Sequence, residues 1–322
     1  EYREVIQLLH MKGIDAKIVG HHGGGTLSGK LKASAERTLQ LAALIEEWKP
    51  DVAVSFSSPE TARAAFGLNI PHVCVNDSPH AEAVARLTIP LSKRLVTPKV
   101  IPKKIWLKFG IAPNSIVQYN ALDPWAWLKD FKPNDRILVQ LGLNRSKPIV
   151  VFRTEEAFAA YLLGKTSKTP TLLSLIEKLC ESNTNFQVVV IPRYETQISK
   201  LKETFGERVV VCEFTTDAPS LLSFTSLFVG AGGTMTTEAA LLGVPTFSCY
   251  PDKPFLIERF LINKRLVTRE NSLKELQIKI LKTLENLESV KKNQTARAQK
   301  LTSKFEDPIK VIMKTILNAV DI

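Results

Sequence analysis

The fold is decided by Leu227-Phe-Val-Gly-Ala-Gly-Gly-Thr-Met-Thr-Thr-Glu-Ala-Ala-Leu-Leu-Gly-Val-Pro-Thr-Phe-Ser-Cys-Tyr250. An apolar run ends in a glycine-rich turn, a helix-forming run follows, and Val244-Pro245 leads into a second apolar run. This order of strand, tight turn, short helix and strand is the repeating unit of a parallel α/β sheet. The segment therefore predicts an α/β protein with a functional turn at the carboxyl edge of its sheet.

The glycines of this turn have a candidate function. Gly230, Gly232 and Gly233 permit positive φ and leave room for a ligand, and the amides that begin the next helix attract phosphate. Glu238 lies one turn further on, where it could accept hydrogen bonds from a ribose. The alternative is an ordinary strand–helix turn in which Glu238 only opposes the helix dipole, because Met235 replaces the third glycine of the dinucleotide fingerprint.

Length and composition predict two domains in a soluble protein. A chain of 322 residues suits two domains of about 150 residues each. We expect the boundary within the polar segment 130–147, which gives domains 1–135 and 136–322. The four cysteines lack metal or redox spacing, and no apolar run is long enough for a membrane span. We therefore expect a cytoplasmic location.

Strands and helices alternate along both halves. The apolar runs predict strands at 15–20, 51–56, 71–76, 94–97, 115–119, 149–152, 186–191, 208–212, 227–229 and 246–250. The intervening patterns predict helices at 1–12, 31–48, 59–66, 79–86, 155–163, 171–181, 195–205 and 236–242, followed by a helical region 272–320. A doubly wound domain normally begins with a strand, so we expect the first strand of the N-terminal domain to be absent from this sequence.

The stretch His21-His22-Gly23-Gly24-Gly25 has three interpretations. It approaches a P-loop, but Leu31 stands where that motif needs Ser or Thr. It is similar to an esterase oxyanion loop, but the chain has no Gly-x-Ser-x-Gly elbow. We favour the third, a backbone-rich wall of a binding cleft in which Gly24 and Gly25 line the ligand and His22 acts as an acid, a base or a phosphate partner. No carboxylate at helical spacing supports a metal site here, and we expect none.

Polar residues follow three further strands. Asp77 could serve as a general base with His80 as its proton partner or an anion contact, although Asp77 and Ser78 could equally cap a helix that begins at Pro79. Arg153 and Arg193 occupy equivalent places in the second half, where they could bind a diphosphate or pair with neighbouring glutamates.

The net charge of +11 is concentrated in one segment. No acidic residue occurs from 83 to 122, whereas the part between Arg86 and Lys108 carries many basic residues together with Trp106. This segment could contact anionic lipid or an anionic acceptor, or it could be a solvated basic face. No recognisable nucleic-acid-binding module accompanies it, so we do not expect nucleic acid as a partner.

Five short segments together resemble one family. They are His21-His-Gly-Gly-Gly25, Ser57-Ser-Pro-Glu60, Asn76-Asp-Ser-Pro-His-Ala-Glu82, Arg193-Tyr-Glu-Thr-Gln197 and Gly230-Ala-Gly-Gly-Thr234. In this order they resemble a prokaryotic family of unknown function that is labelled as predicted glycosyltransferases and looks like the GT-B superfamily. That superfamily includes the peptidoglycan glucosaminyl transferase and the non-hydrolysing nucleotide-sugar 2-epimerases. The sequence departs from the family pattern at its beginning and around Asn120-Ala-Leu-Asp-Pro-Trp125.

The resemblance implies two Rossmann-like domains that face each other across a cleft. It implies that Gly232, Gly233 and Thr234 meet a diphosphate, that Glu238 binds the ribose, and that the first domain supplies the acceptor side. We expect a glycosyltransferase that moves a sugar from a nucleoside diphosphate to an unknown acceptor, lipid-linked or anionic, without a metal or a cofactor. The alternatives are a 2-epimerase and a catalytically silent nucleotide-sugar binder.

Overall fold

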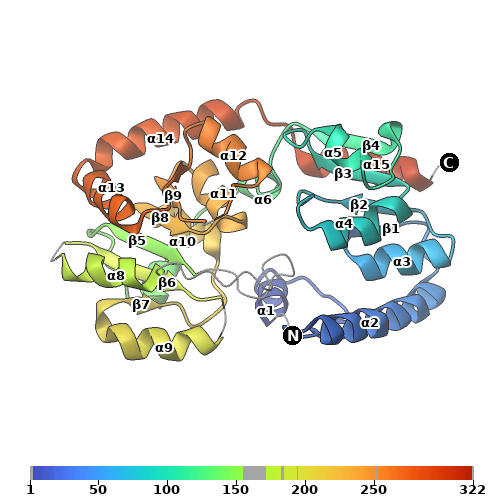
Figure 1. Ribbon diagram of the computed structural model, residues 1–322, viewed down its shortest axis with the longest axis horizontal. Coiled ribbons are helices and arrows are strands. Elements are labelled where there is room, and N and C mark those ends of the chain that lie inside the picture. Colours follow the sequence, from blue (N-terminus) through green and yellow to red (C-terminus); the bar gives the residue numbers. More distant parts are fainter. Residues whose placement is uncertain (1–2, 155–171, 183–184, 194, 251, 321–322) are drawn as a thin grey trace. The chain divides into compact units, whose positions relative to one another are not determined.

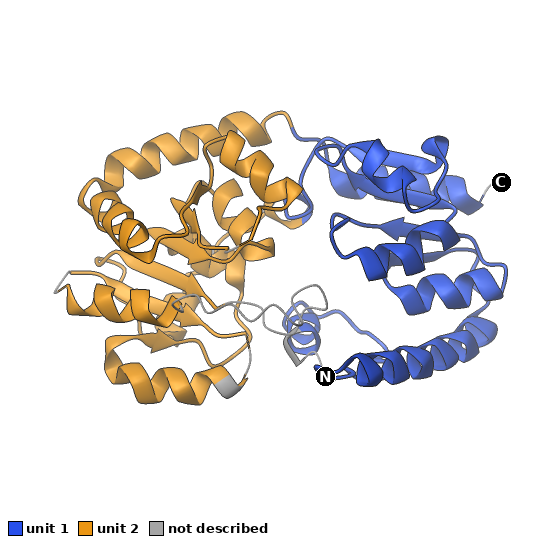
Figure 2. Cartoon of the chain, in the orientation of Figure 1, with its two compact units in different colours: residues 1–126, 158–163, 305–322 blue, residues 127–157, 164–304 orange. Residues whose placement is uncertain are grey.

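The apolar runs of the sequence form two separate parallel sheets. The computed structural model describes residues 3–154, 172–182, 185–193, 195–250 and 252–320. Its alternating helices and parallel strands confirm the expected α/β class. The chain divides into two units (Figure 2): unit 1 holds the described residues of 3–126 and 305–320, and unit 2 holds those between 127 and 304.

Unit 1 is built on a four-stranded sheet in the order β1-β2-β3-β4, with all neighbours parallel (Figure 1). Its strands are β1 (Ala53–Phe56), β2 (His72–Val75), β3 (Arg94–Pro98) and β4 (Ile116–Tyr119). Its helices are α1 (Arg3–Met11), α2 (Leu27–Trp48), α3 (Pro59–Gly67), α4 (Glu82–Thr88), α5 (Lys103–Leu107) and α15 (Pro308–Val320), with 3-10 turns at Ile89–Leu91 and Pro113–Ser115.

The C-terminal helix closes one face of this sheet. Val73, Val75 and Val96 form a buried cluster with Ala319, and Ile316 packs against it. Successive side chains of a strand point to opposite faces of the sheet, so the residue between Val73 and Val75 points to the other face. The helix that is last in the sequence therefore completes the core of the first unit.

Unit 2 contains a six-stranded sheet in the order β10-β9-β8-β5-β6-β7, again parallel throughout. Its strands are β5 (Ile149–Arg153), β6 (Gln187–Ile191), β7 (Val210–Val211), β8 (Leu227–Gly230), β9 (Thr246–Ser248) and β10 (Thr268–Arg269). Its helices are α7 (Arg136–Gln140), α8 (Leu172–Glu181), α9 (Glu195–Phe205), α10 (Ala218–Phe224), α11 (Thr234–Leu241), α12 (Leu256–Asn263), α13 (Leu273–Glu285) and α14 (Leu287–Thr302). A 3-10 turn lies at Gly206–Arg208, and α6 (Trp125–Leu128) crosses the start of the unit.

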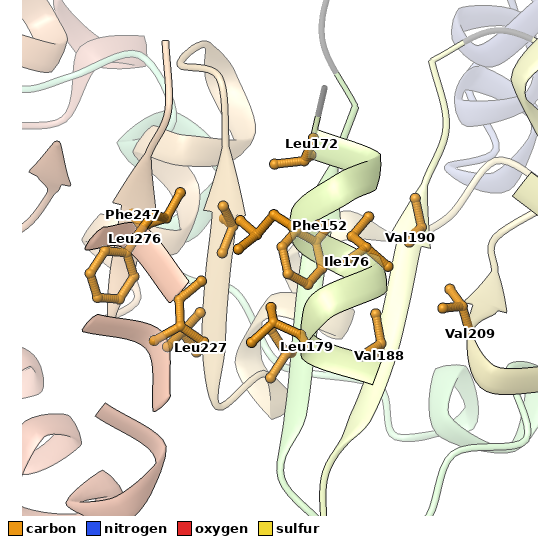
Figure 3. Packing of buried hydrophobic residues seen from close by; sticks show 14 of the residues in the cluster. Phe152, Leu172, Ile176, Leu179, Val188, Val190, Val209, Leu227, Phe247 and Leu276 are labelled. Atoms are coloured by element: carbon orange, nitrogen blue, oxygen red, sulfur yellow. The ribbon is translucent and has the colours of Figure 1, made fainter. Parts of the chain in front are cut away.

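Both faces of this second sheet are buried. Val150 and Phe152 of β5 join one cluster, with side chains of α8, α9 and α13, as Figure 3 shows for α8. Ile149 and Val151 join another, with side chains of α7, α10 and α11. Alternate residues of one strand thus reach opposite cores, which explains why β5 is apolar throughout and why the unit is doubly wound.

Most expected elements are present, and one helix start is confirmed in detail. Helix α3 begins after Ser58, whose hydroxyl accepts a hydrogen bond from the Thr61 amide, and Pro59 occupies its first turn. The short elements α5, α6, α7, α10, α12 and β10 were not expected. The expected helix 155–163 and the loop after it lie outside the described residues.

Two expectations are wrong. Residues 15–20 form no strand, because a strand needs a hydrogen-bonded neighbour and none of the described residues pairs with them. The helix expected from Pro79 begins only at Glu82, and its cap position, Ala81, makes no side-chain cap bond. Asp77 and Ser78 are therefore not capping residues.

The division into units differs from the expected domains. The chain enters unit 2 after Ala126, earlier than the polar segment in which the boundary was expected. It returns to unit 1 at Phe305, because the apolar face of α15 packs on β2, β3 and β4.

Candidate functional site

The glycine-rich turn between β8 and α11 is open. Gly232 and Gly233 have φ values of +83° and +87°, which residues with a β-carbon rarely adopt. Gly233 and Thr234 are exposed, and a β-carbon at Gly233 would meet no atom within 4 Å. Gly230 lacks a positive φ, and a β-carbon there would lie 2.8 Å from the Phe228 ring. The turn is thus not covered by packing.

The start of α11 presents hydrogen-bond donors to this open turn. The first amides of a helix have no partner within it, and Gly233 at the cap position offers no side chain to satisfy them. The hydroxyl of Thr236, in the first turn of α11, is buried and has no hydrogen-bond partner among the described residues. Such a helix end favours a bound anion.

Glu238 lies one turn further along α11 and is almost fully buried. Its Oε1 accepts a hydrogen bond of 2.9 Å from the indole nitrogen of Trp127, a side chain that is 44% exposed. Burial raises the pKa of Glu238, and the Trp127 bond partly offsets this effect. A carboxyl group held in place on one oxygen, beside an exposed indole, is suited to bind a hydroxylated ring that stacks on Trp127.

The two arginines lie at the ends of adjacent strands. Arg153 ends β5 and pairs in register with Ile191 of β6, and Arg193 follows β6. The guanidinium of Arg153 donates to the carbonyl of Pro192 at 2.7 Å, while the backbone amide of Arg193 donates to Thr154 and Gln197. Since β8 is the other neighbour of β5, the Arg153 guanidinium lies on the side of β5 away from the glycine turn. Diphosphate binding by Arg153 and Arg193 stays a prediction.

A carboxyl group that the sequence did not single out lies behind the turn. A β-carbon at Gly232 would lie 3.3 Å from Oε2 of Glu258, on α12. Helices α11 and α12 are neighbours (Figure 1). Glu258 occurs within a mostly apolar helix, Leu256–Asn263, and a carboxyl group in this apolar pattern was the available signal.

In unit 1, Asp77 lies at the carboxyl end of β2. Its Oδ1 accepts a hydrogen bond of 2.6 Å from the Ser78 hydroxyl, and the Ser78 amide donates to Asn76 Oδ1 at 2.7 Å. The buried Asn76 thereby fixes the turn that presents Asp77. Burial raises the pKa of Asp77, and the hydrogen bond from Ser78 partly offsets this shift. A carboxylate with a raised pKa is a stronger base at neutral pH.

Asp123 and Tyr119 are further members of this cluster. The Tyr119 hydroxyl donates to Asp123 Oδ1, and both side chains are buried. Oδ2 of Asp123 has no hydrogen-bond partner among the described residues. Burial and the nearby Asp77 charge raise the pKa of Asp123 to about 7, and burial and the Asp123 charge raise that of Tyr119. The sequence missed Asp123 because Asp-Pro after a strand is also typical of a plain turn.

One family model matches almost the whole chain. The family model described as "Protein of unknown function (DUF354)" matches residues 1–321. This chain belongs to DUF354. An uncharacterized protein of Methanocaldococcus jannaschii is 35% identical over 276 residues, which are 84% of this chain and 77% of that protein.

Solved structures share the fold of this DUF354 protein. The UDP-GlcNAc 2-epimerase from Neisseria meningitidis, bound to UDP-GlcNAc, aligns with a TM-score of 0.72 and 16% identity, covering 98% of this chain and 89% of the epimerase. The glycotransferase of kitacinnamycin aligns with a TM-score of 0.56 and 12% identity, covering 97% and 89%. These neighbours confirm the expected α/β fold with parallel sheets, and at such low identity the likeness is one of fold alone.

In the DUF354 protein, Arg37 connects the loop 21–25 to the segment 57–60 by hydrogen bonds. Arg37 of α2 donates to the carbonyl of His21 at 2.6 Å and to Oε1 of Glu60 at 2.5 Å. Nδ1 of His22 accepts a bond of 3.1 Å from the Gly24 amide, and Gly24 and Gly25 are exposed. The backbones of Gly23 and Gly29 touch, since a β-carbon at Gly29 would lie 2.2 Å from the Gly23 carbonyl oxygen. A ligand contact of His22, Gly24 or Gly25 stays a prediction.

His80 differs from the expectation in its charge. Burial lowers the pKa of His80 to about 4, so the imidazole is neutral at physiological pH. It can exchange a proton or form a hydrogen bond, but it offers no positive charge to an anion under these conditions.

The basic segment of the DUF354 protein hides its aromatic residues. Trp106 and Phe109 are buried, whereas Lys103, Lys104 and Lys108 are exposed. A membrane or anionic contact here would rest on charge rather than on aromatic anchors, and it stays a prediction.

Two features are absent from the described residues. They contain no helix with the length and apolar composition that crossing a bilayer requires. Within the same residues, no three His, Cys, Asp or Glu side chains are grouped so that they could hold a metal ion.

Proposed function

We propose that this protein binds a nucleoside diphosphate sugar at the turn before α11 and transfers the sugar to a hydroxyl acceptor. The observation that carries the proposal is the open turn of Gly232 and Gly233, which combines uncapped helix amides with Glu238 one turn away. The diphosphate binds the amides, and the second oxygen of Glu238 accepts hydrogen bonds from the ribose while Trp127 holds the first. The epimerase of the same fold is described as bound to UDP-GlcNAc, which supports this class of ligand.

The proposed chemistry separates the charges between two sets of groups. The acceptor oxygen forms a bond to C1 of the sugar and gives its proton to a carboxylate base. The bond from C1 to the phosphate oxygen breaks, and the diphosphate leaves with the electron pair. The α11 amides stabilise its negative charge directly, and Arg153 and Arg193, on the other side of β5, contribute positive potential at longer range. Cationic side chains and helix amides would thus do this work without a metal or a cofactor.

A 2-epimerase is the second candidate. Elimination and re-addition of the nucleotide need an acid and a base in one site. Asp77 and Asp123 offer both, because the raised pKa of Asp123, about 7, keeps one proton in the cluster near neutral pH. Labelled UDP-GlcNAc incubated without an acceptor separates the candidates. Formation of the 2-epimer contradicts the transferase, and turnover only after an acceptor is added supports it.

Binding is tested by titration calorimetry of the whole chain with UDP-GlcNAc and UDP-glucose. Charged hydrogen bonds contribute about 1.5–3 kcal/mol each, so Glu238→Ala should weaken binding at least about tenfold. Glu203→Ala, at an exposed position on α9, is the matched control and should leave the affinity unchanged. Unchanged binding by Glu238→Ala would contradict the proposed site, and binding without turnover would support the third candidate, a silent binder.

A further inference from the structure

Glu258 lies against the candidate phosphate turn but belongs to another helix. It is on α12, its side chain is 6% exposed, and its Oε2 is 3.3 Å from the position of a β-carbon at Gly232. Gly233, the next residue, is open on its own side. The carboxyl group of Glu258 is therefore behind the turn whose front would receive a ligand.

Both carboxyl oxygens of Glu258 are buried without a hydrogen-bond partner among the described residues. Burial raises its pKa, whereas the Ser248 hydroxyl at the end of β9 and the Arg269 guanidinium on β10 favour its charged form. From the α11 side, the backbone of Gly232 faces it. Arg269 is also occupied elsewhere, since it donates to the carbonyls of Tyr250 and Asp252. The charge of an ionised Glu258 would thus be only partly compensated.

A diphosphate on the turn would add negative charge close to this carboxyl group. Two like charges about 6 Å apart near a protein surface repel enough to change an equilibrium constant about a hundredfold. The neutral acid does not experience this repulsion. A ligand therefore binds better to the protein in which Glu258 is protonated, and by linkage it holds that proton more tightly.

We propose that Glu258 takes up a proton from solvent when a diphosphate occupies the turn before α11, so that substrate binding and protonation are linked. The inference rests on the proposed function, because it assigns the regulation of that same site. The pKa of Glu258 is then higher in the complex than in the free protein. Affinity is constant below the free pKa, falls as pH rises from the free to the bound value, and is constant again above it.

The experiment is calorimetry of the full chain with UDP-GlcNAc between pH 5.5 and 9.5, in buffers of different ionisation enthalpy. UDP-GlcNAc is suitable because both of its phosphates are esterified, whereas a terminal phosphate titrates near pH 6. The wild type should lose at least about tenfold in affinity across a part of this range and take up about half a proton or more there. Glu258→Gln should bind as the wild type does at low pH, without that loss and without the proton.

The variants separate Glu258 from other groups. Glu258→Gln has the shape of the neutral acid, and its melting temperature reports whether it folds. Arg269→Met supplies a second test: removal of the cation raises the pKa of free Glu258 and moves the fall in affinity to higher pH. Glu275→Gln, at an exposed position on α13, should behave as the wild type.

The outcomes are distinct. A fall in affinity that persists unchanged in Glu258→Gln, or wild-type binding that is equal at every pH, overturns this proposal and leaves the proposed function intact. Absence of binding of every nucleotide sugar at every pH overturns the proposed function and this inference together.

Discussion

Asp123 makes the stability of unit 1 depend on pH. The pKa of Asp123 is about 7 in the folded protein and 3.8 in the unfolded chain, so the folded state binds the proton more tightly. This contribution to stability is complete below pH 3.8 and is lost as the pH rises to about 7. A shift of about three units corresponds to about 4 kcal/mol at most.

Replacement by asparagine tests this prediction. Asp123→Asn removes the titrating group, so its free energy of unfolding relative to the wild type should rise between pH 4 and pH 8. Urea unfolding at several pH values measures the difference. Asp130→Asn changes an exposed carboxyl group and is the control. A constant difference between Asp123→Asn and the wild type would show that the buried acid does not titrate in this range.

At the level of the elements, the turn before α11 allows the cost of backbone strain to be separated from the loss of ligand contact. Gly233 and Gly142 both have a positive φ, +87° and +62°, and neither has an atom within 4 Å of a β-carbon position. An alanine in this conformation costs about 1–2 kcal/mol. Gly233→Ala and Gly142→Ala should therefore both lower the melting temperature, Gly233→Ala by more, because the ψ of −168° at Gly233 together with its positive φ lies in a region that essentially only glycine adopts.

Only Gly233→Ala should affect the ligand. Its methyl group would occupy the open side of the turn and keep a diphosphate from the helix amides, so we expect at least about tenfold weaker binding of UDP-GlcNAc. Gly142→Ala, after α7, should bind normally in the same calorimetric titration. Equal affinities for the two variants would place the ligand elsewhere.

At the level of the whole molecule, the chain leaves unit 1 after Ala126 and returns to it for α15. Ile316 packs on the first sheet, whereas its neighbour Leu317 is 59% exposed. Ile316→Ser should destabilise unit 1 by about 2 kcal/mol, because it removes a packed side chain and places a hydroxyl against the core.

Leu317→Ser is the matched control on the same helix and should change stability by less than about 0.5 kcal/mol. Differential scanning calorimetry measures both variants. If the two side chains had equal effects, α15 would not be part of the first core. Titration with UDP-GlcNAc, the ligand proposed for unit 2, tests whether the effect stays within unit 1.

The local sequence was sufficient where its signals agree. The β8-turn-α11 segment combines an apolar strand, glycines suited to a positive φ, and a run of helix-forming residues. Its form and its open turn therefore follow from the residues themselves. The same holds for the order of strands and helices, since the alternation of apolar runs predicts a parallel sheet.

Tertiary structure decided what the sequence left open. The run 15–20 has strand character but no hydrogen-bonded neighbour, and the C-terminal helix packs on the sheet of the other half of the chain. Asp123 and Glu258 gain their properties from burial and from charges distant in sequence, Asp77 and Arg269. Local sequence fixes backbone preference and hydrophobic period, whereas desolvation and pairing depend on neighbours that only the folded chain brings together.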